Sequence, residues 1–343
     1  MRNRLLPMLI DGKIGIKQWE EMDKDGIERL AEEIFSHYKK MGFPYYKFSA
    51  EEKLKKFKGL KDFLNLKGDD IINNSVIKMT MHGLSLAWSY FPHSWEVRCN
   101  NMKTPMEAFS DDILFKKVIK KRIKRGTYFS LSGIRKALRS YSGVQSVSNF
   151  RPTAAGAIYK RYCKNNSIVW DMSCGYGGRL LGAIASEVVG KYIGNEPCKK
   201  TFDGLSSIKN DFGQNTEIEI SQLGSEEHFP KEESVDFCFT SPPYFNTEKY
   251  SQEEAQSYIK YKTKEEWKTG FLEKTISNCM RALKKGGLLG INVANVKAYK
   301  NLEQDTLDIC KIIGFKHIET LKLLLSSISK GGYKNEPIFV FQK

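Results

Sequence analysis

The sequence of 343 residues has no long apolar run and no closely paired cysteines. A membrane-spanning helix needs about 18 or more consecutive apolar residues, and the apolar patch in the start, MRNRLLPMLIDGK, is too short for a secretory signal. The seven cysteines contain no C-x-x-C pair, which argues against a zinc site or a disulfide framework. We therefore expect a cytoplasmic protein with no metal and no membrane partner, whose cysteines are reduced and mostly buried.

Basic residues outnumber acidic ones, mainly in the first part of the chain. The formal net charge is +15, from 55 Lys and Arg against 40 Asp and Glu. Residues 1–150 hold 28 basic and 17 acidic residues, whereas residues 151–343 hold 27 and 23. Such an excess favours a polyanionic partner such as nucleic acid, although composition alone is equally compatible with a general lysine-rich bias.

From about residue 166 onward, short apolar runs alternate with amphipathic segments, which is typical of a parallel sheet covered by helices. The seven candidate strands span residues 167–171, 192–195, 217–221, 235–240, 288–293, 316–325 and 337–341. The candidate helices between them span residues 179–188, 199–211, 267–283 and 306–313. The pattern predicts an α/β domain with a Rossmann-like sheet of seven strands.

The first part of the chain is predicted to be mainly helical, with helical periodicity at residues 16–41, 50–64 and 105–125 and no clear βαβ unit. In DILFKKVIKKRIKR (residues 112–125), apolar residues share one helical face and basic residues surround it. The apolar residues are Leu114, Phe115, Val118, Ile119 and Ile123, and the basic ones are Lys116, Lys117, Lys120, Lys121, Lys124 and Arg125. This basic face is either an ordinary solvated surface or a phosphate-binding one.

A glycine-rich turn follows the first candidate strand, in VWDMSCGYGGR (residues 169–179). Ligands of doubly wound sheets bind outside the strand ends, where small residues let the backbone approach and a helix N-terminus offers free amides. Asp171, Ser173, Gly175 and Gly177 are therefore candidate ligand-binding residues. The dinucleotide fingerprint G-x-G-x-x-G is not met, because Leu180 occupies the third glycine position.

Acidic residues follow the next two strands. Glu196, about 20 residues after the glycine turn, could accept hydrogen bonds from both hydroxyls of a ribose. Its alternative role is that of a carboxylate at a helix start, favoured by the helix dipole. Ser225 and Glu226 follow the third strand, where they could reach an adenine amine or cap the next turn.

The fourth strand, Val235-Asp236-Phe237-Cys238, leads into Ser241-Pro242-Pro243-Tyr244. The two prolines remove backbone donors and fix φ, so the loop holds its carbonyl groups rigidly. The Ser241 hydroxyl and the Pro242 carbonyl could accept the protons of a planar amine, and the Tyr244 ring could stack on a base flipped out of a helix. The alternative is a Pro-Pro turn that simply ends the strand.

These four residues resemble the (Asp/Asn/Ser)-Pro-Pro-Tyr catalytic motif of the S-adenosylmethionine-dependent DNA amino-methyltransferases. Asp171 to Gly177 is similar to the cofactor loop of that family, Glu196 to its ribose-binding acid, and Ser225 and Glu226 to its adenine-contacting position. NFRPTAA (residues 149–155) resembles the segment that holds the methionine end of the cofactor, and NEPIFVF (residues 335–341) resembles the terminal strand. The resemblance covers about residues 145–343.

The resemblance implies a methyltransferase domain at residues 146–343, preceded by a basic, mainly helical DNA-recognition domain at residues 1–145. It implies S-adenosylmethionine as cofactor, bound by Phe150, Pro152, Thr153 and the candidate residues named above, and Ser241 to Tyr244 as the catalytic residues. DNA is the implied partner, and a cognate restriction endonuclease or defence-system subunit is compatible with it. Ser at the first motif position is commoner in cytosine-amine enzymes, which favours cytosine N4 over adenine N6.

Two departures from the family pattern keep other functions open. The cofactor loop of the family commonly carries Pro-Phe after the acid, where this chain has Met172-Ser173, and no long insertion for target recognition follows Tyr244. One alternative is an amino-methyltransferase of RNA bases, although no dedicated RNA-binding module is visible. The other is a catalytically inactive DNA-binding subunit with a methylase fold.

Overall fold

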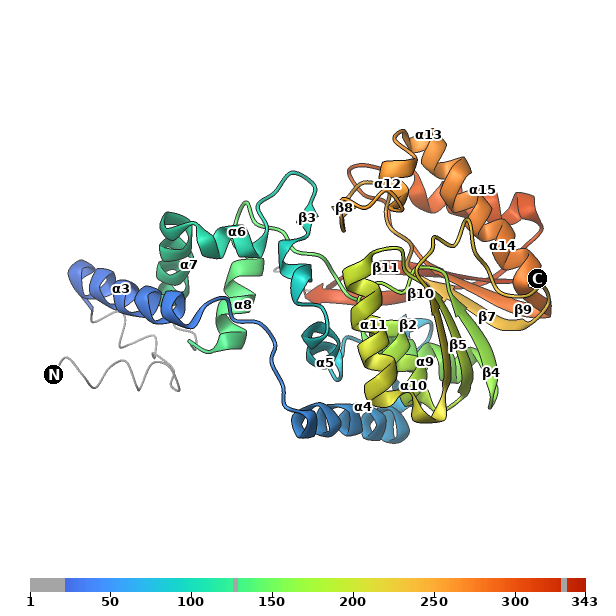
Figure 1. The fold of residues 1–343 in the computed structure, drawn as a ribbon, viewed down its shortest axis with the longest axis horizontal. Coiled ribbons are helices and arrows are strands. Elements are labelled where there is room, and N and C mark those ends of the chain that lie inside the picture. Colours follow the sequence, from blue (N-terminus) through green and yellow to red (C-terminus); the bar gives the residue numbers. More distant parts are fainter. Residues whose placement is uncertain (1–21, 126–128, 328–331) are drawn as a thin grey trace. The chain divides into compact units, whose positions relative to one another are not determined.

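The computed structural model describes residues 22–125, 129–327 and 332–343. The chain forms two compact units. In the described residues, one contains residues 22–46 together with Pro92–Val147, and the other contains Lys47–Phe91 and residues from Ser148 to Lys343. The larger unit carries a single sheet of nine strands among the described residues, and the smaller one is mainly helical (Figure 1).

The sheet contains all seven predicted strands. They are β4 (Ser167–Asp171), β5 (Val189–Asn195), β6 (Glu217–Ser221), β7 (Val235–Thr240), β9 (Leu283–Asn292), β10 (Lys316–Ser327) and β11 (Tyr333–Gln342). Two further short strands, β1 (Ile72–Asn73) and β2 (Val76–Ile77), extend the sheet at one edge, giving the order β1-β2-β10-β11-β9-β7-β4-β5-β6. The predicted Rossmann-like α/β sheet is therefore confirmed.

Strands β9, β7, β4, β5 and β6 are parallel to one another, whereas β11 is antiparallel to both β9 and β10. In the middle of the sheet, Trp170 of β4 lies beside Ile193 of β5 on one side and Cys238 of β7 on the other. Because these strands are parallel, their carboxyl ends share one edge of the sheet, and the segments that follow β4, β5, β6 and β7 are brought together there.

Helices cover both faces of the sheet (Figure 1). On one face lie α9 (Pro152–Tyr162), α10 (Gly178–Ser186) and α11 (Lys199–Phe212), and on the other lie α14 (Lys274–Ala282) and α15 (Leu302–Ile313). The helix predicted at residues 267–283 begins earlier, as α13 (Lys264–Trp267), and continues through a π-helical turn, η3 (Lys268–Glu273), into α14.

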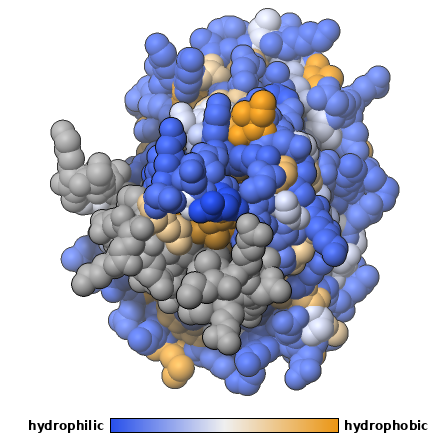
Figure 2. All heavy atoms as spheres, turned by 90° about the vertical axis from the view of Figure 1, so that its left-hand side faces the viewer, coloured by the Kyte–Doolittle hydropathy of each residue, from blue (hydrophilic) through white to orange (hydrophobic). Residues whose placement is uncertain are grey.

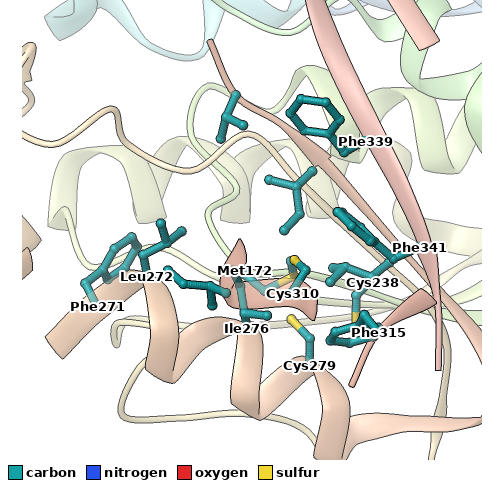
Figure 3. Close-up of a cluster of buried hydrophobic side chains, with 14 of the residues drawn as sticks. Met172, Cys238, Phe271, Leu272, Ile276, Cys279, Cys310, Phe315, Phe339 and Phe341 are labelled. Atoms are coloured by element: carbon teal, nitrogen blue, oxygen red, sulfur yellow. The ribbon is translucent and has the colours of Figure 1, made fainter. Parts of the chain in front are cut away.

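A cluster of buried side chains fills the space between the sheet and the helices α14 and α15 (Figure 3). It contains Phe339 and Phe341 of β11 together with Met172, which follows β4, and the thiols of Cys238, Cys279 and Cys310 also lie in it. All seven cysteines are free and buried, which confirms the expectation for their side chains.

The predicted boundary near residue 145 is close to the end of the smaller unit, but residues 47–91 belong with the sheet. Their helix α4 (Ala50–Ile71) buries Leu60 and Leu64. A Cβ added to Gly156 of α9 would lie 2.5 Å from a methyl group of Leu64, so the glycine provides the space that Leu64 occupies. Assignment of residues 47–91 to a separate N-terminal domain is corrected accordingly, because periodicity identifies a helix but not the surface it packs against.

The helices of the smaller unit are α3 (Lys24–Met41), α6 (Pro105–Ser110), α7 (Asp112–Lys124) and α8 (Leu131–Arg139). The helix predicted at residues 16–41 begins at Lys24 in the described part, and residues 16–21 lie outside the described ranges. The helix predicted at residues 105–125 is broken at Asp111, whose carboxylate accepts a hydrogen bond from the backbone N–H of Leu114 and starts α7.

The larger unit also contains α5 (Leu84–Ser89), which precedes α9 in the chain, and β8 (Glu248–Lys249) and α12 (Ser257–Lys260), which follow β7. In the smaller unit, the 3-10 helix η1 (Pro92–Glu96) precedes β3 (Arg98–Cys99). No helix in the described ranges is both long and apolar enough to cross a membrane. Hydrophilic side chains cover most of the face shown in Figure 2, with isolated hydrophobic ones between them.

Candidate active site

The candidate residues of the larger unit lie at the carboxyl ends of four adjacent parallel strands. Asp171 ends β4, Glu196 follows β5, Ser225 and Glu226 follow β6, and Ser241 follows β7. In the order β7-β4-β5-β6, the Pro-Pro loop after β7 is next to the glycine turn after β4. Glu196, after β5, is one strand farther from the Pro-Pro loop, and Glu226, after β6, is two strands farther. This is the edge at which open α/β sheets bind their ligands.

Asp171 is fully buried, and its two carboxylate oxygens are satisfied by protein groups. Oδ2 accepts hydrogen bonds from Arg179 Nε at 2.8 Å and from the Tyr192 hydroxyl at 2.7 Å. Oδ1 accepts from the Thr240 hydroxyl at 2.9 Å and the Ser173 backbone N–H at 3.2 Å. Asp171 therefore holds the conformation of the turn and ties it to the end of β7, rather than offering a free acceptor.

The glycine turn needs glycine for two different reasons. Gly175 and Gly177 have φ values of +54° and +68°, in the left-handed region that residues with a side chain rarely adopt. Gly178 is required by contact, since an added Cβ would lie 1.8 Å from the backbone oxygen of Phe150. The side chain of Asn149 also donates a hydrogen bond to the Tyr176 carbonyl at 2.8 Å, so the segment at residues 149–153 packs directly on the turn.

The remaining predicted residues of that segment are close to the same turn and strand. The Phe150 ring contacts the Phe239 ring edge to face, with centroids 5.3 Å apart. Pro152 begins α9, and the buried Thr153 hydroxyl shares a hydrogen bond with the hydroxyl of Thr80. Thr80 was not predicted, and nothing in its local sequence indicates that it lies here.

Glu196 is almost completely buried and is oriented by two backbone amides. Its carboxylate accepts hydrogen bonds from the N–H groups of Gly175 and Cys198, both at 3.0 Å. Burial raises the pKa of Glu196 to about 7, although these two hydrogen bonds act in the opposite direction. Each oxygen keeps a second lone pair, so the carboxylate can still accept hydrogen bonds from a diol.

Asn195, which sequence reasoning missed, connects three strand ends. Its side-chain oxygen accepts a hydrogen bond from Trp170 Nε1 at 2.7 Å, and its amide donates to the carbonyls of Leu223 and His228 at 3.2 and 3.0 Å. The residue is fully buried. A buried polar group that loses its hydrogen-bond partner costs about 1–3 kcal/mol. Because Leu223 and His228 lie on either side of Glu226 in the chain, the two bonds of the Asn195 amide hold the loop that carries Glu226.

Glu226 has one satisfied and one unsatisfied carboxylate oxygen. Oε1 accepts a hydrogen bond from Lys260 Nζ at 3.0 Å, whereas the buried Oε2 has no hydrogen-bond partner. The side chain is 1% exposed. The neighbouring Ser225 hydroxyl bonds with Thr275 at 3.0 Å, and its carbonyl accepts from Asn278 at 2.9 Å. Of the two predicted residues, Glu226 therefore offers an acceptor and Ser225 is engaged within the protein.

The Ser241-Pro242-Pro243-Tyr244 loop leaves β7 with Pro242 buried and the other three residues partly exposed. The Tyr244 hydroxyl lies 3.3 Å from the Asn292 carbonyl and 3.4 Å from a carboxylate oxygen of Glu336. Burial raises the pKa of Tyr244 well above its ordinary value, and the Glu336 carboxylate adds to this effect. The phenol therefore stays neutral and is held at its hydroxyl end, which leaves its ring as the part that can contact a ligand.

Phe245, immediately after the motif, has a φ of +54°, which is uncommon for an aromatic residue. Its side chain is buried and contacts the Trp267 ring edge to face, with centroids 6.0 Å apart. Strained backbone of this kind persists where surrounding packing enforces it, and it often marks a functional loop. Here the buried ring turns the chain sharply after Tyr244.

The predicted basic face lies on α7, and two of its six cations are neutralised within the smaller unit. Lys116 pairs with Glu32 of α3 at 2.7 Å, and Lys120 pairs with Glu28 of the same helix. Lys121 lies over the Tyr141 ring, whereas Lys117, Lys124 and Arg125 are exposed. The opposite face packs as predicted, with Phe115, Val118, Ile119 and Ile123 buried and Leu114 partly buried.

No group of three or more His, Cys, Asp or Glu side chains in the described part of the chain is arranged to hold a metal ion. The chemistry of the strand-end residues is that of hydrogen-bond acceptors and a rigid aromatic loop.

Comparison with known families gives one match. Residues 235–343, which include the Pro-Pro loop and the last three strands, match the family model described as DNA methylase. The resemblance to the DNA amino-methyltransferases is thus confirmed for that part of the chain. No curated protein matches the sequence.

Solved structures with a similar fold include several S-adenosylmethionine-dependent methyltransferases. An O-methyltransferase from Thermotoga maritima has 17% identity and a TM-score of 0.41, covering 57% of this chain and 67% of its own. Precorrin-6y C5,15-methyltransferase from Geobacter metallireducens has 14% identity and a TM-score of 0.37, covering 56% and 85%. Magnesium protoporphyrin IX methyltransferase from Synechocystis, with bound S-adenosylmethionine, has 14% identity and a TM-score of 0.37, covering 52% and 71%. Likeness at this level of identity concerns the fold and assigns no substrate.

Proposed function

From a sheet of the methyltransferase type and a C-terminal part that matches the DNA methylase family, we propose that this protein methylates DNA. It transfers a methyl group from S-adenosylmethionine to an exocyclic base amine. Ser at position 241 favours cytosine N4 over adenine N6 as the acceptor. The observation that carries the proposal is the link between β7 and the glycine turn.

That link is the hydrogen bond from the Thr240 hydroxyl to Asp171 at 2.9 Å. It joins the residue just before Ser241 to the acid that organises the turn. This hydrogen bond supports a proposed clamp for the acceptor amine beside the loop that would hold the methyl donor. Positioning of two reactants in this way supplies much of the rate of a direct displacement.

The residues at the strand ends fit S-adenosylmethionine. The glycine turn presents backbone without side chains, and Glu196 retains free lone pairs for the two ribose hydroxyls. The unpartnered Oε2 of Glu226 is an acceptor for the adenine amine. The Phe150 carbonyl lies against Gly178 of the turn, and Pro152 and Thr153 follow at the start of α9, where we place the methionine end.

The cofactor supplies an electrophilic methyl group on sulfur. In the proposed transfer the nitrogen–methyl bond would form as the sulfur–methyl bond breaks, leaving S-adenosylhomocysteine, and the amine would release one proton to solvent. The Ser241 hydroxyl and the Pro242 carbonyl accept hydrogen bonds from the amine protons, which favours the developing positive charge on nitrogen. The ring of Tyr244 stacks on the base, and the contacts of its hydroxyl with Asn292 and Glu336 hold it in place.

DNA contact is assigned to the basic, helical residues outside the sheet. Lys117 and Lys124 of α7 and Arg125, which follows the helix, are exposed, so they are available to phosphates. Lys116 and Lys120 already pair with α3, and they contribute less unless those pairs open.

Incubation of the purified protein with unmodified DNA and methyl-labelled S-adenosylmethionine, followed by nucleoside mass spectrometry, tests the proposal. Labelled N4-methylcytosine is the expected product, and labelled N6-methyladenine would keep the reaction but change the base. A Tyr244→Ala variant serves as the control without the stacking ring. If cofactor binds but no label enters DNA while label enters RNA, the RNA alternative is correct. Absence of cofactor binding would identify an inactive module.

A further inference from the structure

A segment that follows the catalytic motif crosses the three strand ends proposed to hold the cofactor. We name residues 250–261, which include α12, the strap. The Tyr250 ring contacts the Tyr176 ring of the glycine turn edge to face, with centroids 6.2 Å apart. The Glu253 carboxylate accepts hydrogen bonds from the backbone N–H of Lys199, at the start of α11, at 3.1 and 3.2 Å. At the other end of the strap, Lys260 donates a hydrogen bond to Glu226, which follows β6.

The strap is held in a defined conformation. The Tyr258 hydroxyl donates to the Ser251 carbonyl, and Trp267 Nε1 donates to the Ser257 hydroxyl at 3.1 Å. At its end, the Tyr261 ring lies against Gly270 of the π-helical turn, where an added Cβ would be 2.3 Å from the ring. Since π-helical turns often occur at functional sites, the strap is more than a connection between β8 and α13.

Among the buried polar atoms without a hydrogen-bond partner in the described residues, one follows β6, one lies in the strap, and these two are complementary. One is the acceptor Oε2 of Glu226, and the other is the donor Nε2 of Gln256 in the strap. Gln256 is 4% exposed. Both residues adjoin Lys260: its backbone N–H donates to the backbone carbonyl of Gln256 at 3.0 Å, at the start of α12, and its ammonium donates to Glu226 at 3.0 Å. Buried polar groups are nearly always paired, so an unpaired donor and acceptor that adjoin the same lysine indicate a ligand with the opposite pattern.

Adenine has that pattern on its Watson–Crick edge, where the amino group is a donor and the adjacent ring nitrogen is an acceptor. We propose that Gln256 recognises the adenine of the cofactor, with its Nε2 donating to the ring nitrogen while Glu226 Oε2 accepts from the amino group. This inference rests on the proposed function. It also gives the adenine a contact in a chain that has Met172-Ser173 where the related family commonly carries Pro-Phe; Met172 itself lies in the hydrophobic cluster (Figure 3).

Glu226 Oε2 and Gln256 Nε2 are both buried. Adenine can reach them only if the strap shifts, so we include that shift in the proposal. Between the ring contacts of Tyr250 and Tyr261, the strap is joined to the protein by hydrogen bonds and by Lys260, which also pairs with Glu227 at 2.7 Å. Hydrogen bonds and ion pairs of this kind are exchanged more readily than a packed apolar face. The arrangement therefore combines recognition of the base with a cover over it.

The test compares binding of S-adenosylhomocysteine with binding of its inosyl analogue, measured by isothermal titration calorimetry. The inosyl base has a carbonyl in place of the amino group and a ring N–H in place of the acceptor, so it reverses the pattern. Wild-type protein should bind the adenosyl compound at least about tenfold more tightly, because the inosyl base leaves two buried groups mispaired. Equal binding of the two compounds by the wild-type protein would overturn the inference without any variant.

Variants separate Gln256 from Glu226. Gln256→Met keeps a similar size and should weaken binding of S-adenosylhomocysteine about tenfold, whereas Gln304→Met, on the exposed face of α15, serves as the control. The double variant Glu226→Gln with Gln256→Glu exchanges the donor and the acceptor, so it should prefer the inosyl compound. The Glu226→Gln side chain still offers an oxygen to Lys260. Thermal unfolding without ligand checks that each variant is folded.

The outcomes distinguish the inference from the proposed function. If Gln256→Met binds S-adenosylhomocysteine as tightly as the wild-type protein, Gln256 has no part in recognition, and the methyltransferase proposal stands. If the exchanged variant is folded and keeps the adenosyl preference, the assignment of donor and acceptor is also wrong. If wild-type protein binds neither S-adenosylmethionine nor S-adenosylhomocysteine, the proposed function itself fails.

Discussion

Lowering the pH from about 8 to about 6 should weaken the binding of S-adenosylhomocysteine roughly tenfold, because it protonates Glu196. Burial raises the pKa of this carboxyl to about 7, despite the hydrogen bonds from the N–H groups of Cys198 and Gly175. With that pKa, about nine tenths of the groups are ionised at the higher pH and about one tenth at the lower. A protonated carboxyl cannot accept hydrogen bonds from both ribose hydroxyls, so affinity should follow the ionised fraction.

The same carboxyl affects folding stability in the opposite direction. Its pKa in the folded protein is higher than the ordinary value of 4.5, so the folded state binds the proton more tightly than the unfolded state does. The stabilisation from this proton is fully present below the ordinary pKa and is lost as the pH rises through about 7. Between about pH 8 and about pH 6, Glu196 should contribute about 1 kcal/mol of added stability on acidification.

Calorimetric titration with S-adenosylhomocysteine and denaturant unfolding, each at both pH values, measure the two effects. Glu196→Gln is the matched control, since it keeps the shape of the side chain and cannot titrate. Ionisation of the ligand is common to both proteins and cancels in the comparison. A tenfold pH dependence of affinity that persists in Glu196→Gln would show that another group is responsible and would refute the assignment of Glu196 to the ribose.

Three further predictions concern the base, the DNA and the turn. Tyr244→Ala should weaken binding of an extruded base by about 1–3 kcal/mol, measured by fluorescence titration with DNA, and equal loss of S-adenosylhomocysteine affinity would contradict a stacking role. Replacing Lys117 and Lys124 with Gln should reduce the salt slope of DNA binding by about 2, and the same change at the two α7 lysines paired with α3 should reduce it less. An unchanged slope in both variants would mean that α7 does not contact DNA. Gly178→Ala should abolish cofactor binding or folding, because its Cβ would lie 1.8 Å from the Phe150 oxygen. A folded variant with normal cofactor affinity, measured by circular dichroism and calorimetry, would show that the turn adapts.

The local sequence was enough to predict the strands and the positions of the main candidate residues. Parallel strands buried on both faces appear as short apolar runs, and polar residues directly after them must lie at one edge of the sheet. Asp171, Glu196, Glu226 and Ser241 were therefore predicted together, and they lie at or after the carboxyl ends of four adjacent strands. The apolar face of α7 was likewise predicted by periodicity and is buried.

The tertiary structure decided which of these side chains are available and what surrounds them. Asp171 and Glu226 are both acids at strand ends, yet the oxygens of one are satisfied by protein groups and one oxygen of the other is not. The pairing of Lys116 with Glu32 joins residues on different helices, and no spacing within either helix indicates it. Gln256 has no motif around it at all.

The physical reason is the range of the interactions involved. Apolar periodicity, proline and glycine act over a few residues, so the sequence by itself determined the seven strands, the glycine turn and the Pro-Pro loop. Hydrogen bonds and packing join groups that are far apart in the chain, as Leu64 meets Gly156 and Lys260 meets Glu226. The membership of residues 47–91 in the sheet unit, and the strap with its unpaired donor, were therefore decided only by the folded chain.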